Sequence, residues 1–125
     1  MKRKIEEELL TWKEREGRKP LIIRGARQVG KTYTVEAFGG RHFGKIWVLD
    51  FERDPTLKKI FEPDLDTGRI LSLLEVRFGE RLDRANTLIF LDEIQRCPRA
   101  LAALRYFHEE EPDVYVIAAG SLLEF

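Results

Sequence analysis

The chain has little cysteine and histidine, and it lacks a long apolar run. One cysteine and two histidines among 125 residues cannot build a common four-ligand zinc site or an internal disulfide. A lone cysteine fits a reducing compartment. No segment approaches the roughly 18 consecutive apolar residues of a membrane-spanning helix, and the first residues are charged where a secretory signal is apolar. We therefore expect a cytoplasmic protein without a membrane segment.

The sequence also lacks an excess of either charge. Twenty-two basic side chains balance 22 acidic ones, so the formal net charge is zero. Proteins that bind nucleic acid through their overall charge are basic, and this composition does not support such a partner. The length of 125 residues and the 43% apolar content allow one domain with one modest core.

Short apolar runs alternate with amphipathic segments along the chain. Pro98 is typical of a first helical residue, Thr67 of an N-cap and Gly79 of a helix end, and Gly39-Gly40 should stop a helix. With these boundaries, strands are predicted at 20–24, 45–51, 87–91 and 114–119, and helices at 2–16, 31–38, 54–61, 67–78 and 98–110. The run 87–91 is apolar throughout, which predicts a strand buried on both faces.

The segment after the first predicted strand matches a phosphate-binding pattern. Residues 25–32 fit GxxxxGK[ST] at every fixed position, between a predicted strand and a predicted helix. Backbone N–H groups of such a loop surround phosphate oxygens, and the next helix points its positive end at them. Lys31 would reach the β- and γ-phosphates, and the Thr32 hydroxyl would bind Mg²⁺. The residues predicted to contact the nucleotide are Gly25, Ala26, Arg27, Gln28, Val29, Gly30, Lys31, Thr32 and Tyr33.

Two acidic residues, Asp92 and Glu93, follow the third predicted strand directly. The carboxyl ends of parallel strands face the ligand crevice of an α/β sheet. Asp92 is therefore expected beside Thr32, where it would hold Mg²⁺ directly or through a water. Glu93 is placed to accept a proton from an attacking water. The alternative is that both acids only solvate a loop.

The acidic pair also bears on the type of reaction. A kinase needs an acceptor site but no carboxylate dedicated to water, so Glu93 favours an ATPase. Asn86 is the only asparagine, so these residues cannot contain the NKxD motif that reads guanine, and ATP with Mg²⁺ is the predicted ligand. The alternative function is a nucleotide-binding switch or interaction module with negligible turnover. The sequence indicates no particular protein partner.

Four stretches closely resemble the AAA+-type ATPases of bacteria and archaea: RKPLIIRGARQVGKT, VLDFE, TLIFLDEIQRCPRALAALRYFHEE and VIAAGSLLEF. The resemblance covers nearly all of the chain from Arg18 onward. It implies a P-loop NTPase fold, which is a three-layer α/β/α sandwich with, here, four predicted parallel strands. It also implies that Ser121, just past the fourth strand, positions the water or contacts the γ-phosphate. Gln95 is a weaker candidate for that role.

The resemblance sets expectations for domain organisation as well. Residues 1–17 are predicted to form an N-terminal amphipathic helix, and residues 18–125 the ATPase core. Members of the family carry a fifth strand, a lid and usually a C-terminal domain, so the chain is expected to be the N-terminal part of a longer protein. The first strand is expected beside the fourth and, without a fifth, at the sheet edge.

The remaining charged residues are open to more than one interpretation. Arg24 and Arg27 flank the phosphate loop and could touch phosphate, or Arg24 could pair with Asp50 or Glu52 at the neighbouring strand end. Residues 109–111, three glutamates, are expected to form a solvated helix end. Cys97 has no evident acid–base partner and is expected to be structural.

Overall fold

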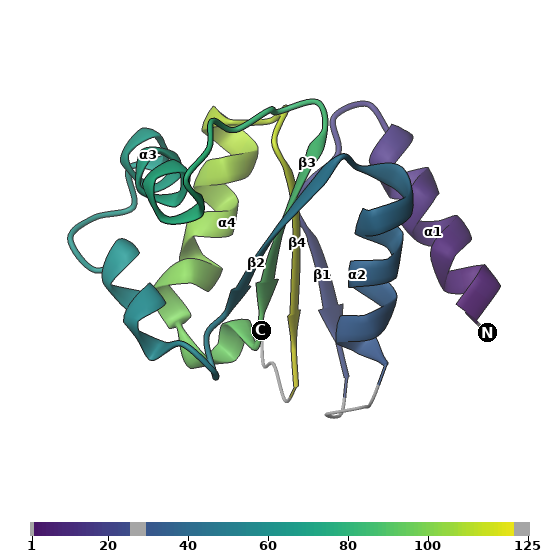
Figure 1. The fold of residues 1–125 in the computed structure, drawn as a ribbon, viewed down its shortest axis with the longest axis horizontal. Coiled ribbons are helices and arrows are strands. Elements are labelled where there is room, and N and C mark those ends of the chain that lie inside the picture. Colours follow the sequence, from purple (N-terminus) through teal and green to yellow (C-terminus); the bar gives the residue numbers. More distant parts are fainter. Residues whose placement is uncertain (1, 26–29, 122–125) are drawn as a thin grey trace.

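The computed structural model describes residues 2–25 and 30–121 (Figure 1). Helices and strands alternate, as the sequence predicts, and two short 3₁₀ helices (η1 and η2) follow β2 and β3. The elements are α1 (Lys2–Glu14), β1 (Leu21–Arg24), α2 (Lys31–His42), β2 (Lys45–Asp50), η1 (Pro55–Ile60), α3 (Thr67–Phe78), β3 (Thr87–Asp92), η2 (Ile94–Arg96), α4 (Pro98–Glu110) and β4 (Tyr115–Gly120).

The strands form one parallel sheet in the order β1-β4-β3-β2. Helices α1 and α2 cover one face of the sheet, and α3 and α4 cover the other (Figure 1). This arrangement confirms the predicted three-layer α/β/α fold of a P-loop NTPase. As expected, β1 pairs with β4, and among the described residues β1 lies at the edge of the sheet.

Strand β3 is buried along its whole length, which confirms the prediction from its continuous apolar sequence. Its side chains alternate between two cores because successive residues of a strand point to opposite faces. Ile89 and Leu91 pack on the side of α3 and α4, whereas Leu88 and Phe90 pack on the side of α1 and α2. Packing on both faces holds the end of this strand, with Asp92 as its last residue and Glu93 directly after it, in a fixed position.

The helix ends confirm two boundary predictions and correct a third. Pro98 is the first residue of α4, and Gly79 ends α3 in the left-handed conformation, with φ 70°. Thr67 is not the N-cap of α3, as predicted, but its first helical residue. The cap is Asp66, whose carboxylate accepts a hydrogen bond from the backbone N–H of Arg69 at 2.9 Å.

The prediction that Gly39-Gly40 stops the second helix is wrong. Helix α2 continues through both glycines to His42. A Cβ atom at Gly39 would lie 2.8 Å from Cδ1 of Ile46 and 3.3 Å from a methyl group of Leu88. The glycine therefore allows α2 to pack closely on β2 and β3, and this tertiary contact outweighs the low helix propensity of glycine.

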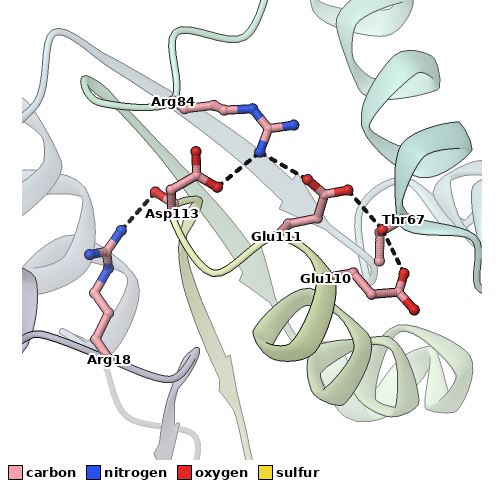
Figure 2. A network of polar contacts seen from close by, with 6 residues as sticks. All are labelled: Arg18, Thr67, Arg84, Glu110, Glu111 and Asp113. Atoms are coloured by element: carbon pink, nitrogen blue, oxygen red, sulfur yellow. Dashed lines mark hydrogen bonds and ion pairs between the residues drawn. The ribbon is translucent and has the colours of Figure 1, made fainter.

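A polar network joins the segments before β1, β3 and β4 (Figure 2), and in it Arg18 donates a hydrogen bond to the backbone carbonyl of Asp113. Arg84, before β3, pairs with Glu111 and with Asp113, and Thr67 at the start of α3 donates hydrogen bonds to Glu110 and Glu111. The prediction of a solvated helix end is wrong for Glu111, whose side chain is only 15% exposed. The network ties α3 and α4 to the loop before β3, at the end of the sheet opposite the phosphate loop.

Candidate functional site

The candidate site lies where the carboxyl ends of β1, β3 and β4 meet. β1 ends at Arg24, β3 at Asp92 and β4 at Gly120, and β4 lies between the other two. Gly25 and Gly30 are the described residues at the start and near the end of the phosphate-loop pattern, and their φ angles are 154° and 127°. These positive values favour glycine, so the pattern requires glycine at both positions for a conformational reason.

Lys31 and Thr32 are the first two residues of α2, and they point their side chains in different directions. The Lys31 ammonium donates a hydrogen bond to the backbone carbonyl of Gly25 at 3.3 Å, so it reaches back to the residue after β1. Tyr33 is 62% exposed. The other predicted contact residues, Ala26, Arg27, Gln28 and Val29, lie outside the described residues.

The hydroxyl of Thr32 lies next to Asp92, as the sequence predicts. Thr32 Oγ1 donates a hydrogen bond to Asp92 Oδ2 at 2.7 Å, and the backbone N–H of Glu93 donates to Asp92 Oδ1 at 2.9 Å. Asp92 is only 4% exposed. Burial raises the pKa of its carboxyl above the usual value; the two hydrogen bonds oppose this shift, whereas the charges of Asp50 and Glu93 add to it.

The Thr32–Asp92 pair has the donor chemistry that Mg²⁺ requires. In residues 2–25 and 30–121, no group of three or more His, Cys, Asp or Glu side chains could hold a metal by itself. Mg²⁺ does not need such a cage, because it takes one or two protein oxygens and completes its octahedron with water and substrate phosphates. A hydroxyl and a carboxylate 2.7 Å apart, beside a phosphate-loop pattern, therefore fit this ion.

Glu93 and Ser121 come from different strand ends and are linked through Gln95. The side-chain amide of Gln95 donates to Glu93 Oε1 at 2.8 Å and lies 3.4 Å from Ser121 Oγ. Ser121 is 6% exposed. The backbone of Glu93 is left-handed, with φ 54°, and it turns the chain from β3 into η2. The structure thus brings together the predicted residues Asp92, Glu93 and Ser121.

Two features of this site were not predicted from the sequence. The link through Gln95 depends on the turn at Glu93, and neither the turn nor its direction has a sequence signal such as glycine. The proximity of Asp50 to Asp92 follows from the register, since the two residues are direct partners on β2 and β3. The carboxylate of Asp50 accepts hydrogen bonds from the backbone N–H groups of Glu52 and Arg53.

In the described part of the chain, no helix is long and apolar enough to cross a membrane. No curated protein sequence matches the chain. A protein-family model described as an AAA domain matches residues 17–125, which include every residue of the candidate site. The chain therefore belongs to the AAA domain family.

Proposed function

We propose that the chain binds Mg-ATP at residues 25–33 and hydrolyses it. The family match indicates a nucleotide-binding, ATPase-like function in general. The observation that carries the specific proposal is the position of Asp92 and Glu93. One carboxylate lies 2.7 Å from the Thr32 hydroxyl at the start of α2, and the next residue lies beside the end of β4. A P-loop NTPase needs a carboxylate near Mg²⁺ and a residue that orients the attacking water, and Asp92 and Glu93 are placed for these two roles.

Each residue has a role that its position supports. The loop amides and the N-terminus of α2 would bind phosphate oxygens, and Lys31 would exchange its hydrogen bond with the Gly25 carbonyl for the β- and γ-phosphates. Thr32 and Asp92 would hold Mg²⁺, which when bound neutralises charge on the phosphates. Burial keeps Asp92 away from solvent, so its charge is available to a cation at short range.

Hydrolysis requires a base and a group near the γ-phosphate. Glu93 would accept a proton from water while the water oxygen bonds to the γ-phosphorus and the bond to the ADP oxygen breaks. Ser121, near the end of β4, would donate a hydrogen bond to the γ-phosphate or to the water. The products are ADP and inorganic phosphate, and the proton leaves through Glu93.

We also propose adenine as the base and the cytoplasm as the compartment. Asn86 lies before β3, at the end of the sheet opposite Lys31, and its side chain accepts a hydrogen bond from the backbone N–H of Gly44 at 2.9 Å. Asn86 therefore stabilises a turn far from the phosphate loop, where it would not read a guanine base. Cys97, the only cysteine, is buried, as expected of a structural thiol, and burial raises its pKa. A lone cysteine of this kind fits a reducing compartment such as the cytoplasm.

Glu93→Gln tests the proposal against the alternative of a switch that does not turn over. The expected result is a loss of about 10²–10⁴ in kcat, with the Kd of Mg-ATP nearly unchanged. The matched control is Glu52→Gln, which makes the same chemical change beyond the end of the neighbouring strand β2 and should leave kcat within about twofold. Wild-type protein that binds Mg-ATP but releases no phosphate would favour the switch.

A further inference from the structure

The contacts of Gln95 extend beyond the turn that contains it. Gln95 is the middle residue of η2, between Ile94, which is buried, and Arg96, which is exposed. Its Nε2 atom lies 2.8 Å from Glu93 Oε1 and 3.4 Å from Ser121 Oγ. One amide group therefore contacts both of the side chains that the proposed hydrolysis places near the γ-phosphate.

The chemistry of the partners fixes the orientation of this amide. A carboxylate only accepts hydrogen bonds, so the NH₂ group of Gln95 must face Glu93, and a flipped amide would bring two oxygens together. Ser121 Oγ then accepts from the same NH₂ group, over the longer distance, and its own hydrogen is left to point elsewhere. The amide oxygen of Gln95 is buried and has no partner among the described residues.

We propose that Gln95 is a positioning residue for ATP hydrolysis. It holds the Glu93 carboxylate in one rotamer and orients the Ser121 hydroxyl. This inference rests on the proposed ATPase function and adds to it a residue that couples the ends of β3 and β4.

The left-handed backbone at Glu93 explains how Gln95 can contact both Glu93 and Ser121. A non-glycine residue at φ 54° is uncommon, because its Cβ atom crowds the backbone in this conformation. The turn places Gln95 two residues later, where its amide reaches back to Glu93 and across to Ser121. If the bond served only to close the turn, Gln95 would affect stability but not the chemistry, and the two roles can be separated by experiment.

The first experiment is a double-mutant cycle on phosphate release. Gln95→Leu removes the donor at similar size and is expected to lower kcat by roughly 10- to 100-fold, because a small misplacement of a reacting group has effects of this order. The Kd of Mg-ATP should change less than about twofold, since Gln95 itself contacts neither the phosphates nor Mg²⁺ in the proposed complex. In a Glu93→Gln background, Gln95→Leu should lower kcat much less than in the wild type, because only the part that acts through Ser121 remains.

Two further variants protect the experiment against misfolding and general damage. Gln95→Glu keeps the size but puts a second carboxylate beside Glu93, so its kcat should fall at least as far as that of Gln95→Leu. Arg96→Gln removes the ion pair with Glu52 on the exposed side of the same turn, and it should leave kcat within about twofold. A loss in Arg96→Gln equal to that in Gln95→Leu would overturn the proposal, because any change in the turn would then suffice.

A second readout does not depend on turnover. The chain contains only three primary amide side chains, Gln28, Asn86 and Gln95, so their NH₂ signals in a ¹⁵N-correlated NMR spectrum are easily assigned. Glu93→Ala should shift the Gln95 signal far more than that of Asn86. An unmoved Gln95 signal, or full activity of Gln95→Leu, would overturn this inference alone. Absence of Mg-dependent phosphate release from the wild type would overturn the proposed function, and the inference with it.

Discussion

Replacing Asp92 with asparagine should stabilise the nucleotide-free protein while it removes the response to Mg-ATP. Asp92 is 4% exposed, and burial raises the pKa of its carboxyl. Asparagine has the same shape, and its oxygen can still accept the hydrogen bond from the backbone N–H of Glu93. Its NH₂ group can donate to the Thr32 hydroxyl, so both hydrogen bonds survive and only the one with Thr32 reverses its direction. What disappears is a buried charge beside the carboxylates of Asp50 and Glu93.

The expected gain is about 1 kcal/mol, within the roughly 0.5–2 kcal/mol typical of single stabilising substitutions. For a domain of this size, this corresponds to a rise of about 4 °C in the melting temperature. The direction in which the free energy of unfolding changes with pH can also be predicted. Because the folded-state pKa of Asp92 is raised, wild-type stability falls as pH rises through it. The advantage of Asp92→Asn should therefore grow from about pH 4 upward and then level off.

Urea unfolding without nucleotide or Mg²⁺, followed from about pH 4 to about pH 8, measures this difference directly. Asp66→Asn is the matched control, because Asp66 is exposed and asparagine caps a helix as well as aspartate does. It should change the free energy of unfolding by less than about 0.5 kcal/mol. An Asp92→Asn variant that is less stable than wild type at every pH would refute the reasoning, since the buried carboxylate would then be a net source of stability.

Three other substitutions test the fold and its polar contacts. Phe90→Ala should cost about 3–5 kcal/mol in urea unfolding, because Phe90 is completely buried on the central strand β3, whereas Val76→Ala, at a site 78% exposed, should change stability by less than about 0.5 kcal/mol. Thr67→Val should cost about 1–2 kcal/mol, because the buried hydroxyl donates to two glutamates at the end of α4, and an unchanged midpoint would contradict this. The pKa of Glu80 is lowered mainly by the hydrogen bond from the Trp47 indole and secondly by that from Lys45. The ionised Glu80 therefore stabilises the fold above the usual pKa of 4.5, and this contribution is lost as pH falls through the lower folded value. Trp47 fluorescence should report that step, and Glu80→Gln should abolish it.

The sequence predicts well wherever local chemistry decides the structure. Pro98 begins a helix because its fixed φ suits that position, and Gly79 ends one because it tolerates positive φ. The apolar run of β3 predicts burial on both faces. The pairing of Thr32 with Asp92 was also predictable, because a phosphate-loop pattern and a strand end determine where each residue lies.

Prediction fails where contacts between distant residues decide. Gly39 does not end α2, because Ile46 packs so closely against the helix that only a residue without a side chain fits there. Glu111 is held by Arg84 rather than by solvent, and no spacing along the chain connects these two residues. The contacts of Gln95 depend in the same way on the left-handed turn at Glu93. A glutamate in the sequence does not predict such a turn.

A thermal-shift titration with Mg-ATP tests the central claim most directly. A ligand at 100 times its Kd stabilises the folded state by about 2.7 kcal/mol, which for a domain of this size raises the melting temperature by about 8–12 °C. We predict such a rise with Mg-ATP and Mg-ADP, a much smaller one with Mg-GTP, and none with Mg-ATP in Lys31→Ala. No rise with any nucleotide, or an equal rise in Lys31→Ala, would contradict nucleotide binding at this loop.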